Sequence, residues 1–567
     1  MSNHDLKRII ICGYPYLQEK YIMRTLLLYF FVMTTTLSYG QNLNTLTPLQ
    51  IKKLDSIATQ DVPNGAPGIG TGIVSNGKII YEKVAGFANL KDSILITKNS
   101  RFNIASNGKQ FTALQILVLI DEGKLKLADD IRKYLPTIYP KLTSKLTIEN
   151  LLNHTSGIRD VYDLWSLQGL TWWEHSFDNK IVLQLIEKQQ ELNFEPNSKY
   201  LYSNSNYILL ALIMEKVTGK TFVENTNELF LKLNMPNTSF ESDHRKIRGQ
   251  IAKAYFNFDT WTTYNWIWNV CGDGNLFSTL SDQLEWEQII QGKPNNQIKK
   301  TIIEESQNLT NNSIFKNYGY GLEFGTYKGL NYKFHEGATG AWKATVTRFT
   351  DKISFITLTN TGKSTPDRQT RQMVDVVFNL NEKSNNFETK PTKVGSFVSD
   401  EDIIGTYQTE DNYTFQFEKR DNILYLKRIG RNDVGLEREA DNIFNQTYNK
   451  NFKQEFKKNE KDEMTVTVYY TSHSPYTLTK SNSNWNDFNF KSINGKFRNI
   501  ETNVDIKIKY INDKNYEIKS RNQDVTTGLL ITPSKLLVEN YVLEIEKSNT
   551  ILLSSGRIQK VKFIRVE

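Results

Sequence analysis

Residues 101–123 of this chain read RFNIASNGKQFTALQILVLIDEG, and this stretch decides how the surrounding sequence folds. Its apolar residues recur at helical spacing: Phe111, Leu114, Leu117, Val118 and Ile120. Gly123 follows them, as a glycine does just beyond the end of a helix. Because almost every side of the run is apolar, we expect a helix buried in the centre of a domain.

The tetrapeptide SNGK opens this run at Ser106–Lys109, and the same tetrapeptide occurs earlier at Ser75–Lys78. In the earlier copy an Asn-Gly pair joins two alternating apolar runs, which is typical of a type I′ hairpin turn. In the later copy the residues begin a helix, where side chains three apart share a face. We therefore predict a turn at the first copy and a Lys109 ammonium beside the Ser106 hydroxyl at the second.

Length and composition indicate a globular protein of more than one domain. The chain has 567 residues, of which 39% are hydrophobic and 12% aromatic, and single cores usually stop growing well below that length. Its formal charge is +8, from 70 basic and 62 acidic residues. The basic residues form no dense block, so we expect no nucleic-acid partner.

The N-terminal region, residues 1–40, has the layout of a secretory signal. From Met23 a basic residue precedes an apolar run and then small residues, with cleavage expected near Gly40. Met1–Ile22 would then precede the true start. The apolar run is short for a permanent membrane helix, so we expect an exported protein, periplasmic or extracellular, without a stable membrane span; a membrane anchor is the alternative. Loss of Cys12 would leave only Cys271, and hence no internal disulfide.

Beyond the signal, the pattern of elements predicts three domains. In residues 41–380 alternating apolar runs at both ends flank a helical middle, which predicts an α/β sandwich whose sheet is completed by the two ends of the domain. Residues 381–398 are polar and are interpreted as a linker. The remainder alternates with frequent turns, which is typical of an all-β barrel; there is room for one large barrel, but we favour two, over 399–490 and 491–567.

Two further motifs follow the serine and lysine along the chain. Tyr202-Ser203-Asn204 lies just before an apolar helix, and His335-Glu336-Gly337 lies at the end of a predicted strand. Together with Ser106–Lys109 these motifs resemble the S-x-x-K, Y-x-N and K-T-G motifs of the serine β-lactamase and penicillin-binding protein superfamily, the last in its H-x-G form. The stretches LLNHTSGIRD at Leu151 and GDGNLFSTLSDQLEW at Gly272 also look like this family.

The resemblance covers roughly Leu46 to Leu380 and implies a fold. That fold is a β-lactamase-like sandwich, with an antiparallel sheet flanked by helices and an all-helical subdomain. The H-x-G form, joined to C-terminal β domains, resembles the class C β-lactamase-like D-aminopeptidases and the related esterases and carboxypeptidases. The two C-terminal β domains resemble the lipocalin-like barrels that some of those enzymes carry.

The resemblance also implies roles for the reacting groups. Ser106 would be the nucleophile, and Lys109 and Tyr202 would handle its proton. Serine needs a base in reach, and lysine can be that base only where its pKa is lowered. Whether Lys109 or Tyr202 is the base stays open in the sequence.

The surrounding residues would bind the substrate. Asn204 would orient the lysine and the substrate amide. On the binding strand His335 would face the pocket, and Gly337 would let the substrate approach the strand edge closely. The backbone N–H groups of Ser106 and Ala338 would hold the oxyanion. No metal and no organic cofactor is implied.

We therefore expect a serine hydrolase that forms an acyl-enzyme with small peptides, amides or esters, above all those of D-amino acids. A neutral His335 in place of lysine gives less fixed positive charge for a substrate carboxylate, which disfavours efficient β-lactam hydrolysis. The alternative is a penicillin-recognising fold kept as a catalytically weak binding or sensing module.

Overall fold

The structure is a computed structural model. It describes residues 45–567 apart from short stretches at 259, 295–296, 311–314, 316, 350–351, 381–395, 410–412, 428–432, 471–472, 482–484, 486–487, 521–524, 540 and 548. The predicted signal region, with its start at Met23, lies outside the described residues, and so does most of the predicted linker. Across the described part, every helix is too short or too polar to cross a membrane.

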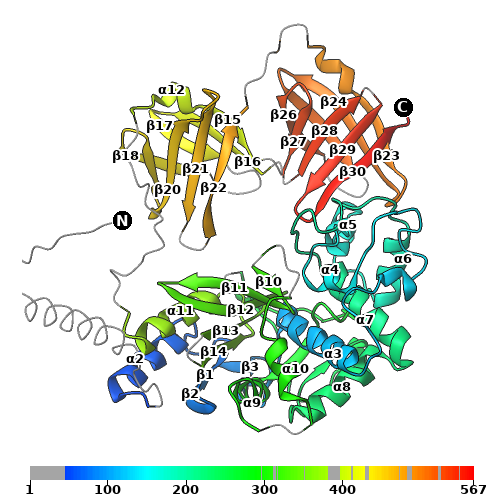
Figure 1. Cartoon of the computed structure of the whole chain (residues 1–567). Helices are drawn as coiled ribbons and strands as arrows, with labels where there is room; N and C mark the ends of the chain where they lie inside the picture. The colour runs from blue at the N-terminus through cyan, green and yellow to red at the C-terminus, as the bar shows by residue number, and fades with distance from the viewer. Residues whose placement is uncertain are drawn as a thin grey trace, which may run out of the picture. The chain divides into compact units, whose positions relative to one another are not determined.

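A seven-stranded antiparallel sheet forms the centre of the first domain (Figure 1). Its strands, in spatial order, are β10 (Tyr318–Gly319), β11 (Leu322–Tyr327), β12 (Leu330–Thr339), β13 (Trp342–Phe349), β14 (Ile353–Thr359), β1 (Ile69–Ser75) and β2 (Lys78–Ala85). The early strand β1 pairs with the late strand β14 along its whole length. The prediction that the two ends of the domain complete one sheet is confirmed.

Helices cover both faces of this sheet. Successive residues of β1 point to opposite faces. A side chain at Gly70 or Gly72 would meet α9 (Leu280–Ile290), whereas the Thr71 hydroxyl reaches Met373 of α11 (Pro366–Val377). The glycines let α9 approach closely, since a Cβ at Gly72 would lie 2.8 Å from a Leu284 methyl carbon. The N-terminal helix α2 (Pro48–Thr59) packs beside α11.

The first SNGK copy is the turn between β1 and β2. Asn76 and Gly77 both have positive φ, 49° and 75°, as a type I′ turn requires. Ser75 and Lys78 face each other across the hairpin. This prediction is confirmed.

The second copy begins the central helix. Residues Ala105–Gly108 form a 3-10 turn, and α3 (Lys109–Asp121) continues from it. Every residue of α3 from Lys109 to Leu119 is buried, so the prediction of a central helix is confirmed. Gly123 has φ of 73°, the left-handed conformation expected just beyond a helix.

The helical middle of the domain packs around α3. Its helices are α4 (Ile148–Leu152), α5 (Val161–Leu167), α6 (Asn179–Glu187), α7 (Asn204–Thr218), α8 (Phe222–Lys232) and α10 (Lys300–Glu305). Short strands complete the domain: β3 (Phe87–Asn89), β4 (Ile94–Leu95), β5 (Arg101–Asn103), β6 (Ser239–Phe240), β7 (Phe256–Phe258), β8 (Thr260–Thr262) and β9 (Leu276–Thr279). Helices α7, α8 and α10 contact α3 directly. The antiparallel sheet with flanking helices and a helical subdomain is the fold that the resemblance implies.

The C-terminal region forms two closed eight-stranded antiparallel barrels, not one large barrel (Figure 1). The first follows α12 (Asp400–Ile403) and consists of β15 (Gly405–Gln408), β16 (Thr414–Arg420), β17 (Ile423–Lys427), β18 (Val434–Ala440), β19 (Ile443–Gln446), β20 (Asn449–Lys458), β21 (Met464–Tyr470) and β22 (His473–Lys480). The second consists of β23 (Gly495–Asn499), β24 (Val504–Asn512), β25 (Asn515–Ser520), β26 (Thr526–Thr532), β27 (Lys535–Val538), β28 (Tyr541–Lys547), β29 (Thr550–Ser555) and β30 (Ile558–Arg565). Their likeness to lipocalins stays a prediction.

The central position of α3 leads to a prediction about stability. Leu114 is 0% exposed, so Leu114→Ala leaves a cavity, and we expect it to lower the free energy of unfolding by about 2–5 kcal/mol. Leu49 on α2 is 63% exposed, so Leu49→Ala is the matched control, with a change below about 0.5 kcal/mol. Chemical denaturation followed by circular dichroism measures both. Equal losses in the two variants would contradict a core built around α3.

Candidate active site

Ser106 lies on a tight turn that the neighbouring residues enforce. Ala105 has φ of 48°, a conformation that is uncommon for a residue with a side chain and that clusters at functional sites. The Ala105 N–H donates to the Asn103 side chain at 2.9 Å, which stabilises this conformation. Gly274 packs against Ala105, where a Cβ would lie 3.2 Å from the Ala105 carbonyl carbon. The backbone therefore presents Ser106 at the start of the 3-10 turn.

The Lys109 ammonium is buried against the Ser106 hydroxyl. Its side chain is 0% exposed, and Nζ donates to Ser106 Oγ at 3.1 Å, to Asn204 Oδ1 at 2.9 Å and to the Asp273 carbonyl oxygen at 2.6 Å. Burial lowers the pKa of Lys109 to about 8, against the opposing effect of the Asp273 and Asp160 carboxylates. A fraction of this lysine is thus neutral near pH 7.

Tyr202 closes the other side of the serine. Its hydroxyl forms a hydrogen bond with Ser106, and its ring centre lies 4.9 Å from Lys109 Nζ. Burial raises the pKa of Tyr202 well above its ordinary value, so the phenol keeps its proton at neutral pH. His154 holds the Tyr202 loop in place, because its Nδ1 accepts the Ser203 N–H at 3.2 Å and its ring packs against that of Tyr202, with the ring centres 4.3 Å apart.

Asn204 is the first residue of α7, and a buried carboxylate fixes its side chain. Asp160 Oδ2 accepts from both the Asn204 backbone N–H at 2.7 Å and Asn204 Nδ2 at 2.9 Å. With its amide nitrogen held this way, Asn204 must turn its oxygen toward Lys109. Asp160 also caps α5, because its Oδ1 accepts the Tyr162 N–H. Sequence analysis includes Asp160 in a family-like stretch but gives it no role.

Two residues of β12, the strand that carries the H-x-G motif, lie differently from what the sequence predicts. We expected His335 to face the pocket, but it is 2% exposed and lies behind the cleft, with Nε2 3.2 Å from the Tyr318 hydroxyl and Nδ1 2.7 Å from the Glu336 carbonyl oxygen. We expected Gly337 to admit substrate, but a Cβ there would lie 2.2 Å from the Ile104 carbonyl oxygen. Glycine is therefore required so that β12 can pack against the serine turn.

A cleft of about 460 Å³ opens at the serine. It is lined by four of the predicted site residues: Ser106, Tyr202, Asn204 and Ala338. Ser106 and Ala338, the two predicted oxyanion donors, thus share one cavity. His335 and Gly337 do not belong to its lining.

Seven further aromatic side chains line the cleft and form what we call its aromatic wall; the sequence alone gave them no role. They are Tyr162, Trp165, Trp172, Trp173, Phe177, Trp266 and Trp268. Their signal in the sequence is the close spacing of tryptophans at 172–173 and 266–268. Arg557 of the second barrel also lines the cleft. No local pattern in the sequence points to it.

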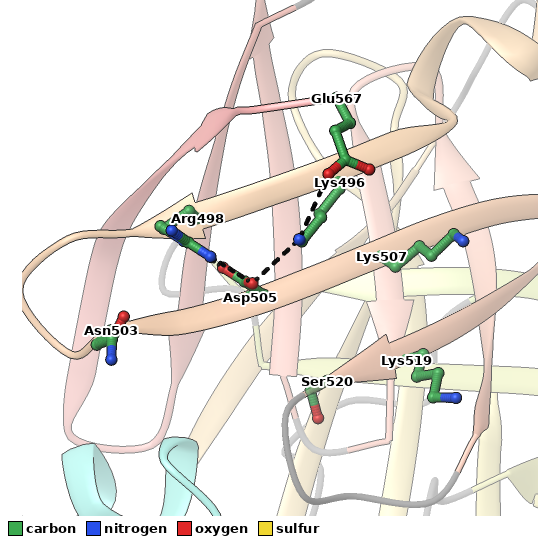
Figure 2. A pocket seen from close by; sticks show the side chains of 8 residues that line it. All are labelled: Lys496, Arg498, Asn503, Asp505, Lys507, Lys519, Ser520 and Glu567. Atoms are coloured by element: carbon green, nitrogen blue, oxygen red, sulfur yellow. Dashed lines mark hydrogen bonds and ion pairs between the residues drawn. The ribbon is translucent and has the colours of Figure 1, made fainter.

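A second hollow lies on the second barrel and has a different character (Figure 2). Its volume is about 570 Å³, and charged side chains line most of it. Asp505 forms ion pairs with Arg498 at 2.6 Å and with Lys496 at 3.5 Å, so two of the cations that line the hollow are already paired. Nothing there matches the serine, lysine and tyrosine arrangement. Among the described residues, moreover, acidic, histidine and cysteine side chains nowhere gather in a group of three that could hold a metal ion.

Comparison with known proteins assigns the family. The family model described as Beta-lactamase matches residues 54–378, more than half of the chain. The chain therefore belongs to the beta-lactamase family of serine hydrolases, which also includes penicillin-binding proteins. The family resemblance of the sequence is confirmed at this level.

Particular relatives cover different shares of the chain. Protein flp of Staphylococcus aureus (strain MRSA252) is 34% identical over 200 residues, which span 34% of this chain but only 39% of that relative. Penicillin-binding protein 4* of Bacillus subtilis (strain 168) is 27% identical over 381 residues, covering 63% of this chain and 82% of the relative. The octameric penicillin-binding protein homologue from Pyrococcus abyssi is similar in fold, with a TM-score of 0.54 at 21% identity over 76% of this chain and all of that one.

The buried lysine leads to a prediction about pH. A protonated Lys109 cannot accept the serine proton, so the rate at which a fluorophosphonate labels Ser106 should rise with pH and level off above about 8. Lys109→Met should slow labelling by about 10²–10⁴-fold. Lys78→Met, in the other SNGK copy, is the matched control. A labelling rate that is flat from pH 6 to pH 9, from about two units below that pKa to about one unit above it, would contradict a titrating lysine.

Proposed function

We propose that the protein is an exported serine hydrolase that forms an acyl-enzyme with amides, peptides or esters of D-amino acids. The observation that carries the proposal is the double contact of the Ser106 hydroxyl, with Lys109 Nζ at 3.1 Å and with the Tyr202 hydroxyl. A serine hydroxyl becomes a nucleophile only where a base lies within hydrogen-bond reach. Both groups meet that requirement, and Ser106 and Tyr202 line an open cleft.

In the first step Ser106 Oγ forms a bond to the substrate carbonyl carbon while its proton passes to Lys109. The base is the lysine and not the tyrosine, because a neutral amine is populated near neutral pH and the Tyr202 phenolate is not. The carbonyl oxygen becomes an oxyanion, which the backbone N–H groups of Ser106 and Ala338 stabilise. One such donor contributes about 3 kcal/mol to transition-state stabilisation.

In the second step the bond from carbon to the leaving group breaks. Tyr202 gives its proton to the departing amine or alcohol and takes back the proton held on Lys109. Water then attacks the acyl carbon and loses a proton to the same lysine. The bond to Ser106 Oγ breaks, and the serine regains its proton.

Charge and shape in the cleft indicate the substrate. Burial lowers the pKa of His335 to about 3, so the residue in the place of the family's lysine is neutral. The aromatic wall offers stacking area for a bulky apolar substituent. Arg557 also lines the cleft, but it is paired with Asp160 and Asp163. Substrates with an aromatic side chain next to the scissile bond, and without a required carboxylate, therefore suit the site best. The H-x-G form with its C-terminal barrels resembles enzymes that act on D-amino-acid substrates, and the signal-like residues 1–40 support export.

One prediction of the proposed function concerns the nucleophile. Purified full-length protein should react with a fluorophosphonate probe and with fluorescent penicillin, because both acylate or phosphonylate an activated serine. Ser106→Ala should abolish both signals, whereas Ser75→Ala in the hairpin copy should keep them. Folded protein that takes no label from either probe would favour the binding or sensing module instead.

Another prediction of the proposed function concerns the aromatic wall of the cleft. We expect D-phenylalanine amide to be hydrolysed with a higher kcat/KM than D-alanine amide, and nitrocefin to be a poor substrate. Trp172→Ala should reduce the preference for the phenylalanine amide by about 10-fold, as loss of one apolar contact in a pocket does. Tyr413→Ala, at an exposed aromatic of the first barrel, is the control. An unchanged preference in Trp172→Ala would contradict the assignment of the wall.

A further inference from the structure

One contact of the second barrel with the catalytic domain is made by the tip of a hairpin. The tip is Gly556-Arg557, between β29 and β30. Gly556 has φ of 47°, and a Cβ there would lie 2.9 Å from Asp163 Oδ2, so only glycine fits without strain. The next residue, Arg557, donates its backbone N–H to the same oxygen at 2.7 Å. The hairpin is thus shaped for close contact with the first turn of α5.

Side chains on both sides strengthen this contact. Asn193 Nδ2 donates to the Arg557 carbonyl oxygen at 2.9 Å, and the Gln559 N–H donates to Asn193 Oδ1 at 2.7 Å. Between β23 and β24 of the same barrel, Glu501 pairs with Arg159, whose side chain is 1% exposed, at 3.1 Å. A guanidinium buried to this degree is costly without a partner, so the pairing marks a specific interface.

The Arg557 guanidinium reaches a buried carboxylate of the active site. Its Nη2 lies 2.7 Å from Asp163 Oδ1 and 3.3 Å from Oδ1 of Asp160, whose side chain is 0% exposed. Asp160 holds Asn204 through two hydrogen bonds, and Asn204 accepts from the Lys109 ammonium. A continuous series of contacts therefore runs from the barrel to the lysine: Arg557, Asp160, Asn204 and Lys109.

We propose that Arg557 is a positioning residue for Lys109: by pairing with Asp160 it keeps that carboxylate charged, and the charged carboxylate orients the Asn204 amide that holds the lysine. The proposal rests on the function proposed above. It gives the second barrel a role in the active site of the same chain. Sequence analysis could not assign any role to the barrels.

The charges around these groups explain why the arginine is needed. Burial raises the pKa of Asp160, and Arg557 opposes that rise, while Asp163 adds to it. Burial also gives Tyr162 a pKa well above its ordinary value, so beside Asp160 it is a neutral group. Arg557 is thus the positive group that counters both burial and Asp163 at this carboxylate.

Lys109 is faced by a second set of titratable groups. Asp273 favours its charged form, while Tyr202 and Tyr207 are phenols with raised pKa values and stay neutral. Burial lowers the pKa of both His154 and His335, so these rings are neutral too. With Arg557 removed, either Asp160 takes up a proton and releases Asn204, or it stays charged and raises the pKa of Lys109. Both outcomes move the onset of activity to higher pH.

The experiment compares full-length Arg557→Ala, Arg557→Lys and Lys562→Ala. Lys562→Ala removes the same charge from the same hairpin at an exposed position and is the matched control. The pH dependence of fluorophosphonate labelling and of kcat/KM is recorded, and thermal unfolding checks that each variant is folded. For Arg557→Ala we expect labelling to slow by roughly 10-fold to 100-fold. The rise of the labelling rate on the acidic side of the pH profile, the acid limb, should move to higher pH by about half a pH unit or more. Arg557→Lys should restore the limb toward that of the parent, and Lys562→Ala should match the parent.

A double-mutant cycle separates positioning from docking. If Arg557 acts through Asp160, Arg557→Ala should shift the acid limb more in the parent than in an Asp160→Asn background, where no carboxylate remains to be neutralised and only the direct repulsion between Arg557 and Lys109 is lost. Additive effects, or an acid limb in Arg557→Ala that superimposes on the parent's, would overturn the inference and leave the proposed function standing. A rise in KM at unchanged kcat and unchanged pH profile would also overturn it, since that indicates direct substrate binding. A parent that takes no label at all would overturn both.

Discussion

The structure of the catalytic domain depends on one buried ammonium group. Lys109 lies at the start of the central helix, fully removed from solvent, and a lysine in that position is costly unless its protons find acceptors. Three acceptors meet it, from the serine turn, from the start of α7 and from the loop that carries Asp273. Neighbouring residues hold two of these segments in place, since Asn103 fixes the serine turn and Asp160 fixes Asn204. The buried polar residues that surround the serine are thus organised about one cation.

The same interaction links stability to chemistry. Burial that makes the lysine costly also lowers its pKa to about 8, and this shift is what allows an amine to act as a base near neutral pH. The serine turn is also unfavourable by itself and needed for the chemistry. Ala105 has a left-handed backbone conformation, which is unfavourable, and this conformation presents the Ser106 hydroxyl to the cleft. The pKa of Tyr202, on the other side of the serine, is raised by burial, so its phenol remains a proton donor. Two groups with oppositely shifted pKa values on one hydroxyl form an acid–base pair.

Local sequence was enough to distinguish the two SNGK copies and to outline the fold. Asn-Gly between alternating runs predicts a turn, and an apolar run on all sides predicts a buried helix; both predictions hold because local patterns decide them. The sequence could not reveal why Gly337 is glycine, since the group it avoids is a backbone oxygen more than 200 residues away. It also could not reveal Arg557, which meets Asp163 across 394 positions of the chain. Contacts between distant segments leave no pattern in the local sequence. The motifs at the ends of helices and strands are short stretches of neighbouring residues, so the sequence does show them.

The measurement that tests this account most directly is the pKa of Lys109 itself. Full-length protein with isotope-labelled lysine, assigned by comparison with Lys109→Met, allows the ammonium to be titrated by heteronuclear NMR. The account predicts one lysine that titrates near pH 8, well apart from the exposed lysines. A Lys109 signal that titrates with the exposed lysines, at about 10.4, would contradict the claim that a buried, partly neutral amine activates the serine.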